Sequence, residues 1–208
     1  IDACLVGSEM CIRDRDWDAF LGAQRAFTVG QQRTLHKYVH GWLPTGNHME
    51  HRYGTKSSCP DCAQPENNDH VFRCETQAQH KQTFVQHFRE QMKNWNTEPG
   101  LAKLLLQTIQ DQPQEYSGTE KNQKWITQLQ QEQQAIGNEL IWRGFLSQTW
   151  GDIQESFYRR ENSPKECTGV QWTRKIIRII WNFILQTWTR QNQKLHEDPQ
   201  NTPPHRQH

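Results

Sequence analysis

Long hydrophobic runs and an excess of charge are both missing from this sequence of 208 residues. Hydrophobic residues make up 33% of the chain, the mean hydropathy is -1.01, and the net charge is +1 at pH 7. The most apolar stretch, residues 176–188, is interrupted by Arg178, Asn182 and Gln186 and is too short to cross a bilayer. A net charge near zero argues against a globally basic nucleic-acid binder, although local basic stretches can still exist. We therefore expect a soluble protein of one or two domains, with an economical core and no membrane partner.

The six cysteines lack the even spacing of a secreted disulfide framework. Cys4 and Cys11 lie near the start of the chain, three others cluster, and Cys167 stands alone. This pattern favours a reducing intracellular compartment and does not distinguish the nucleus from the cytoplasm. Cys167 is interpreted as a loop thiol, because no second cysteine near it in the sequence could give it a redox role.

Residues 5–15, which read LVGSEMCIRDR, show neither a helical nor a strand period. Written back into codons, this stretch resembles a transposon-end sequencing adaptor joined to a fragment whose natural start lies upstream. We therefore exclude residues 1–15 from fold reasoning as an artefactual or disordered segment. The expectation is that residues 1–14 make almost no native contacts.

Apolar residues recur with a helical period through most of the remaining chain, and no alternating strand pattern is present beyond a short hairpin at the cysteine cluster. Residues 128–134, QLQQEQQ, are predicted to form the solvated face of one helix. The last helix is apolar on more than one side, which predicts a central position in a bundle. The expected helical segments are residues 16–40 (one or two helices), 69–95 with Asp69 as N-cap, 98–109, 119–141, 152–160 and 170–196.

Residues 59–74, CPDCAQPENNDHVFRC, carry the strongest chemical signal. Cys59 and Cys62 are separated by two residues, and His70 and Cys74 are four apart, so the latter pair would share one face of the first helical turns. Three thiolates and one imidazole suit a tetrahedral Zn²⁺, and a site filled by four protein ligands leaves no position for a reacting water. We therefore predict a structural zinc ion bound by Cys59, Cys62, His70 and Cys74.

These observations define the expected architecture as mainly α, with a small zinc knuckle followed by a helical bundle. Residues 16–110 are predicted to form a zinc-binding helical module, and residues 111–120 form a polar linker that contains Pro113 and Gly118. Residues 121–196 are predicted to form a helical bundle extension. Residues 197–208, which contain three prolines, are predicted to be a disordered tail.

The spacing of these motifs resembles the reverse transcriptase zinc-binding domain family, found in the C-terminal region of retrotransposon-encoded polyproteins. The resemblance is carried by Leu43-Pro44-Thr45, by Cys59-Pro60-Asp61-Cys62 and Glu66, and by Asp69-His70, Val71-Phe72 and Cys74. A weaker likeness continues through residues 135–196, although Gln191-Asn192 stands where family members often have Arg-Asn. The resemblance covers about residues 34–196 and implies a polymerase domain upstream of this fragment.

The fragment itself is expected to be non-catalytic. Its sequence contains neither the aspartate pair of a polymerase nor the spaced acids of a ribonuclease H. The enzyme alternative is a metal nuclease that uses His36, His40, His48 and His51, but no carboxylate pair accompanies these histidines.

The leading functional hypothesis is an accessory module that helps the polymerase hold template RNA or target DNA. Candidate phosphate-binding cations lie around the zinc motif and in the last helix, where residues 167–196 contain no acid. These cations are Arg52, Lys56, Arg73, Arg174, Lys175 and Arg178. They could equally be ordinary solvated surface residues. The alternative function is a zinc-stabilised helical scaffold that contacts the upstream polymerase, which exposure of Trp142, Trp150 or Trp181 would favour. The oligomeric state is not predicted.

Overall fold

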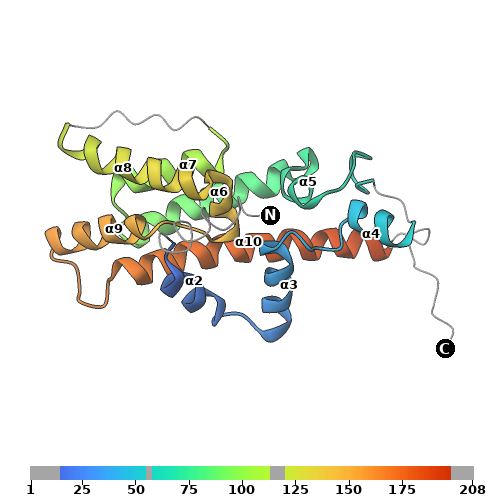
Figure 1. The fold of residues 1–208 in the computed structure, drawn as a ribbon, viewed down its shortest axis with the longest axis horizontal. Coiled ribbons are helices and arrows are strands. Elements are labelled where there is room, and N and C mark those ends of the chain that lie inside the picture. The colour runs from blue at the N-terminus through green and yellow to red at the C-terminus, as the bar shows by residue number, and fades with distance from the viewer. Residues whose placement is uncertain (1–14, 55–57, 113–119, 198–208) are drawn as a thin grey trace, which may run out of the picture. The chain divides into compact units, whose positions relative to one another are not determined.

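The computed structural model describes residues 15–54, 58–112 and 120–197, and helices account for most of them (Figure 1). Within these ranges the only β pairings are two isolated bridges, Arg15 with Ser147 and Ser58 with Pro65. The prediction of a mainly α fold is therefore confirmed. The predictions for residues 1–14, for most of the linker and for the tail from residue 198 lie outside the described residues. None of the helices described is both long and apolar enough to span a membrane.

The chain divides into two compact units, each assembled from separate stretches of sequence. Unit 1 comprises residues 1–28 and 83–181, and unit 2 comprises residues 29–82 and 182–208. This grouping differs from the predicted division into residues 16–110 and 121–196. The reason is that α6 (Ala78–Asn94) and α10 (Gly169–Glu197) each contribute residues to both units, whereas the sequence-based division assumed contiguous domains.

Unit 1 is built from helices around a core of large aromatic and aliphatic side chains. Trp150, Trp172 and Trp181 are almost fully buried, as are Phe88 and Met92 from α6. Residues of α10 such as Ile176, Ile177 and Ile180 are buried on adjacent faces, which confirms the predicted central role of this helix in its unit. The remaining elements are α2 (Trp17–Gln24), α7 (Pro99–Ile109), α8 (Glu120–Ile136), the 3-10 helix η2 (Asn138–Arg143) and α9 (Gln148–Arg160).

Side-chain caps fix where two of these helices begin. Asp16 accepts a hydrogen bond from the Ala19 amide at the start of α2, at 2.8 Å. Glu98 accepts one from the Leu101 amide at 2.8 Å and is followed by Pro99 as the first residue of α7, which confirms the predicted helix start there. Arg15, which the sequence assigns to the excluded segment, pairs with Ser147 and places its guanidinium 4.3 Å from the Phe145 ring centroid. Arg15 therefore belongs to the described fold, although the sequence-based boundary excludes it.

Helices α9 and α10 approach each other at two glycines. A Cβ atom on Gly169 would lie 2.0 Å from the carbonyl oxygen of Gly151, so no larger residue fits at Gly169 without moving the backbone. Thr173 lies one turn further along α10 and is also close to Gly151. This close contact positions the residues of α9 against the core of unit 1.

Two buried glutamines, Gln133 and Gln154, connect the backbone of unit 1, and Gln133 makes the larger number of contacts. Gln133 is 1% exposed, and its amide oxygen accepts hydrogen bonds from the Ser147 amide (3.1 Å) and the Trp150 indole (3.0 Å). Its amide nitrogen donates to the carbonyl oxygens of Gly137 (3.2 Å) and Phe145 (3.1 Å). The interpretation of residues 128–134 as a wholly solvated face is therefore wrong at Gln133, because the side chain is satisfied internally.

Unit 2 contains α3 (Val29–Val39), α4 (Gly46–Tyr53), α5 (Asn68–Arg73) and the 3-10 helix η1 (Glu75–Gln77), with parts of α6 and α10. Leu35, Leu43 and Val71 are almost fully buried, and the rings of Tyr38 and Phe72 meet edge to face at 5.0 Å. Residues of α4 contribute no buried side chain at all.

The single helix predicted over residues 69–95 is wrong, because the structure divides this segment into three. The N-cap of α5 is Asn67, which accepts a hydrogen bond from the His70 amide, and not Asp69. Helix α5 stops before Cys74, whose backbone is extended (φ −56°, ψ 132°), and η1 and α6 follow. Cys74 therefore does not sit on a helical turn with His70, and the break allows its sulfur to reach the other cysteines.

Candidate metal centre

A tight loop presents the first two candidate ligands. The Cys59 amide donates to the Gln64 carbonyl at 2.7 Å, and the Ala63 amide donates to the Cys59 carbonyl at 3.0 Å. Ala63 adopts a positive φ of 60°, which closes the turn, and the bridge between Ser58 and Pro65 joins the two sides of the loop. Among the residues described around the cluster, this bridge is the part of the expected short hairpin that is present.

The four predicted ligand residues converge on one point. The ligand atoms of Cys59, Cys62, His70 and Cys74 all lie within 4.8 Å of one another. The Cys59 and Cys74 sulfurs are 4.0 Å apart, close to the edge of about 3.8 Å that a tetrahedral zinc–thiolate site requires. The Cys62 sulfur lies 3.2 Å from Nε2 of His70. The cluster therefore has both the donor set and the spacing to hold a metal ion.

The thiols of the cluster lie in contrasting environments. Burial raises the pKa of the Cys59 thiol to about 11. Burial also acts to raise the pKa of Cys74, but hydrogen bonds with Thr76, Cys62 and Cys59 together outweigh it and bring the pKa below its usual value. A bound metal ion would stabilise both thiolates by its charge.

A buried side chain of α10, Gln191, contacts the cluster together with the buried Glu66. Nε2 of Gln191 lies 4.0 Å from the Cys59 sulfur, and the same amide donates to the carboxylate of Glu66. Both Gln191 and Glu66 are 1% exposed. A hydrogen bond to a ligating sulfur and a buried carboxylate partner are the kinds of contact that orient metal ligands.

Glu66 also connects the cluster to α4. Its second carboxylate oxygen accepts a hydrogen bond from the Gly46 amide at 2.7 Å, and its carbonyl oxygen accepts one from the Asn47 amide at 2.9 Å. These two amides belong to the first turn of α4, where intrahelical acceptors are absent. These bonds connect the Leu43-Pro44-Thr45 turn to the end of the loop of residues 58–65, which is called the metal loop below.

A more exposed set of contacts surrounds Asp61 in the metal loop. Lys194 of α10 forms an ion pair with Asp61, with its ammonium 2.8 and 2.7 Å from the two carboxylate oxygens. The Thr76 hydroxyl lies 3.3 Å from Asp61 and 3.0 Å from the Cys74 sulfur. Helix α10 therefore contacts this loop at Asp61 as well as at Cys59.

Sequence reasoning did not assign Gln191 and Lys194 to the site. Gln191 follows the buried Trp188 by three residues and Ile184 by seven, so all three lie on the same face of α10. Gln191 is the polar residue on this otherwise apolar face. A polar residue on an apolar face indicates a specific hydrogen-bond partner, and this signal could have identified it. The partner itself was not readable, because Cys59 is more than a hundred positions away in the chain.

The predicted nucleic-acid-binding cations divide between the two units. In unit 2, Arg52 and Arg73 are exposed, and the Arg52 guanidinium lies 5.6 Å from the Tyr53 ring centroid. Lys56 falls outside the described residues. These positions leave both arginines at the surface of the unit that contains the cluster.

The cations of α10 are instead used inside unit 1. Arg178 donates a hydrogen bond to the Gly22 carbonyl at 3.0 Å, and the guanidinium of Arg174 lies against Gly22. The Lys175 ammonium lies 5.8 Å from the ring centroid of Trp95. All three side chains are half-buried, so they do not form the exposed basic row that the sequence suggests.

The other reactive side chains are not grouped. His36, His40, His48 and His51 are exposed, and across the described residues only the cysteine cluster brings three or more candidate metal ligands together. Cys167 is half-buried in the turn between α9 and α10, where its amide donates to the Pro164 carbonyl at 2.9 Å.

Comparisons with known protein families, with curated proteins and with solved structures find no match for this chain.

Proposed function

We propose that this chain is a non-catalytic, zinc-ordered module of a retrotransposon reverse transcriptase polyprotein. It helps the polymerase to bind template RNA or target DNA. The observation that carries the proposal is the convergence of Cys59, Cys62, His70 and Cys74 within 4.8 Å. Three sulfurs and one imidazole favour zinc, and four protein ligands leave no open coordination position for catalysis. The role of the ion is then to order the loop and the elements that contact it.

The surface attached to this cluster has the chemistry of a nucleic-acid contact. Helix α4 buries no side chain and exposes Arg52 and Tyr53, and its first turn is bound to Glu66. Trp42, in the turn before α4, is 65% exposed and stacks on His40 with ring centroids 5.0 Å apart. Exposed aromatic rings offer stacking surfaces to unpaired bases, and arginines neutralise phosphates.

The retroelement origin rests on the resemblance of the motifs in residues 34–196. In that setting the polymerase would lie upstream, and RNA template or DNA target would be the partner. Localisation in the nucleus or cytoplasm fits reduced cysteines, which zinc binding requires.

The test combines metal analysis with binding. We expect elemental analysis of the purified chain to find one zinc per molecule, and fluorescence anisotropy to detect single-stranded RNA or DNA with an affinity that falls as salt rises. Cys62→Ser should abolish both. Arg52→Gln should weaken binding, whereas Arg33→Gln, at another exposed position of unit 2 on α3, serves as the matched control. Absence of zinc from a chain with intact cysteines would overturn the proposal.

The alternative function, a protein-interaction scaffold, loses two of the side chains on which it depended. Trp150 and Trp181 are each 1% exposed, and Trp142 is half-buried with its ring 6.0 Å from that of Phe84. A zinc-loaded chain that binds neither RNA nor DNA would favour this alternative, with the exposed Trp42 as its first candidate contact.

A further inference from the structure

Gln191 on α10 lies beside two buried acceptors, a carboxylate and a cysteine sulfur. Its Nε2 atom is 4.0 Å from the Cys59 sulfur and also donates a hydrogen bond to the carboxylate of Glu66. Gln191 and Glu66 are each 1% exposed, and Cys59 is 3% exposed. A buried carboxylate next to a buried thiolate is unfavourable unless hydrogen-bond donors satisfy both groups. The two N–H bonds of one amide are therefore placed to serve both acceptors.

Glu66 fixes the orientation of this amide. A carboxylate only accepts hydrogen bonds, so the end of the Gln191 side chain that faces it is the NH2 group and not the carbonyl oxygen. The other carboxylate oxygen of Glu66 accepts from the Gly46 amide at 2.7 Å, which restricts the rotation of the carboxylate. The contact with Glu66 thereby directs an N–H donor, and not an acceptor, towards Cys59.

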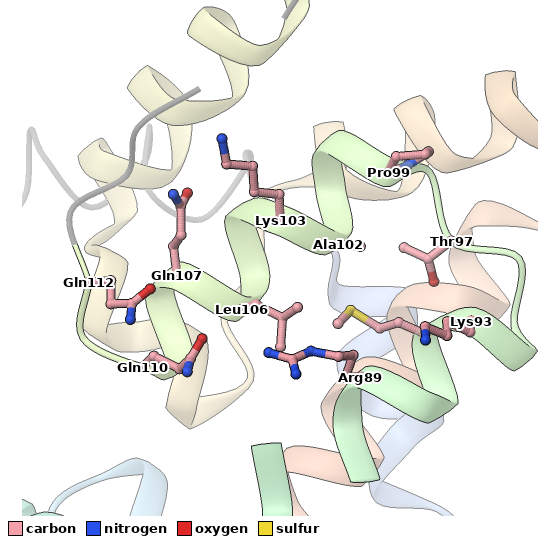
Figure 2. A pocket seen from close by; sticks show the side chains of 11 residues that line it. Arg89, Lys93, Thr97, Pro99, Ala102, Lys103, Leu106, Gln107, Gln110 and Gln112 are labelled. Atoms are coloured by element: carbon pink, nitrogen blue, oxygen red, sulfur yellow. The ribbon is translucent and has the colours of Figure 1, made fainter. Parts of the chain in front are cut away.

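Four other glutamines show how the surroundings of Gln191 differ. The NH2 group of the buried Gln133 donates to two backbone carbonyls, and that of Gln154 donates to one. Gln110 and Gln112 line the cleft between α6 and α7 of unit 1, but none of the eleven residues that line it is acidic or a cysteine (Figure 2). Gln191 differs from these four because its NH2 group faces a carboxylate and a sulfur.

A second contact from α10 restricts the position of Gln191. Lys194 lies three residues further along the helix, on the same face, and its ammonium is 2.8 and 2.7 Å from the two carboxylate oxygens of Asp61. Asp61 lies between Cys59 and Cys62 in the metal loop. The last turns of α10 therefore contact the loop at two points, which keeps the Gln191 amide close to the sulfur.

We infer that Gln191 is a positioning residue of the metal centre, which donates one N–H to the Cys59 thiolate and the other to Glu66. The inference rests on the zinc binding that the proposed function includes, and it extends the centre beyond its four ligands to α10. A hydrogen bond to a zinc-bound thiolate draws electron density from the sulfur, so the sulfur reacts more slowly with electrophiles. Gln191 thereby helps to retain the ion and protects Cys59 from alkylation.

The test uses the full chain loaded with Zn²⁺ or with Co²⁺, whose thiolate charge-transfer band reports the electron density on sulfur. Gln191→Met keeps the length of the side chain and removes its donor. Gln193→Met, at an exposed position two residues further along α10, is the matched control. A third variant combines Glu66→Gln with Gln191→Glu, which keeps a hydrogen bond between the two side chains but turns a carboxylate towards Cys59.

We expect Gln191→Met to lower zinc affinity about tenfold in chelator competition. At saturating Co²⁺ its charge-transfer band should move to longer wavelength, because a sulfur without a hydrogen bond gives up electron density more easily. Iodoacetamide should alkylate Cys59 faster in the zinc-loaded variant than in the zinc-loaded unsubstituted chain. The exchanged pair should restore neither the affinity nor the band, and Gln193→Met should match the unsubstituted chain in all three measurements.

An unchanged cobalt band in Gln191→Met would overturn the inference even if affinity fell, because the residue would then only join α10 to Glu66. Restoration of the affinity and the band by the exchanged pair would overturn it for the same reason. Both results would leave the proposed zinc-ordered function standing. Failure of the unsubstituted chain to bind zinc or cobalt would overturn the inference and the proposed function together.

Discussion

The two units bury polar groups by different means. In unit 1, the amides of Gln133 and Gln154 are satisfied by backbone and indole groups of the same unit. In unit 2, Glu66 and Gln191 are buried beside a cluster of thiols that is arranged to hold a metal ion. We therefore expect unit 2 to depend on a bound metal ion for its folding, whereas the two buried glutamines of unit 1 need none.

The apolar core of unit 1 contains more large buried side chains than that of unit 2. The largest fully buried side chains belong mainly to unit 1, including Trp150, Trp172 and Trp181, while Leu35 and Leu43 represent unit 2 among them. Large aromatic side chains provide most of the burial energy in a polar sequence. The hydrophobic contribution to stability is therefore smaller in unit 2, and we expect unit 2 to be less stable than unit 1 when no metal ion is bound.

The largest expected difference between the two units is their response to loss of the metal ion. In Cys62→Ser, or in the unsubstituted chain with a strong chelator, we expect unit 2 to lose an apparent binding free energy of about 10 kcal/mol and to unfold locally. Hydrogen exchange followed by mass spectrometry should show lost protection in α4 and α5 and retained protection in α7 and α9. Cys167→Ser is the control, because this thiol lies outside the cluster. Joint loss of protection in both units would contradict the comparison.

The amide cluster of unit 1 can be tested with two neighbouring glutamines. Gln133→Ala leaves buried backbone groups and the Trp150 indole without partners and should lower the free energy of unfolding by about 3 kcal/mol. Gln134→Ala, at an exposed position of the same helix, should change it by less than about 0.5 kcal/mol. Denaturant unfolding monitored by tryptophan fluorescence measures both. Similar values for the two variants would show that the Gln133 hydrogen bonds contribute little.

A substitution of Glu66 tests whether this residue couples the metal cluster to α4. Glu66→Gln keeps the shape but removes the negative charge that accepts from Gly46 and Gln191, so we expect zinc affinity to fall about tenfold. The amides of α4 should exchange faster at the same time. Chelator competition measures the affinity, and Glu50→Gln, exposed on α4, provides the control. Unchanged affinity with faster exchange would limit the role of Glu66 to the helix.

The smallest effect is expected at the ion pair between Lys194 and Asp61. The Lys194 side chain is 47% exposed, so Lys194→Gln should cost unit 2 less than about 1 kcal/mol, and added salt should reduce that cost. Arg159→Gln removes an exposed pair with Glu155 in unit 1 and should be equally mild. Thermal unfolding at low and high salt compares them. A clearly larger loss at Lys194 would show that α10 is held on the metal loop mainly by this pair.

Local sequence patterns predicted the ligand set and many of the helices. Cys59, Cys62, His70 and Cys74 follow a spacing that constrains where their side chains can point, and Glu98-Pro99 is a helix start that depends only on neighbouring residues. The exception within the motif is Cys74, which was placed on a helical turn with His70. Its extended backbone ends α5 before Cys74, and local helix propensity does not predict that break.

The sequence pattern did not predict the side-chain environments that depend on contacts between distant segments. Gln133 looked like one of many solvated glutamines, and the cations Arg174 and Arg178 looked like a phosphate-binding row. Each owes its environment to a residue far away in the chain: Gln133 to the turn at Phe145 and Ser147, and the arginines to Gly22. The same applies to Gln191 and Glu66, which are 125 positions apart.

The sequence by itself determined a helical protein with a four-residue metal-binding motif, because helical periodicity and ligand spacing are local properties of a chain. The tertiary structure alone decided which polar side chains are buried, which cations remain exposed and how α10 supports the metal loop. Those outcomes depend on desolvation and on hydrogen-bond partners brought together from distant segments, and burial becomes defined only when the chain has packed.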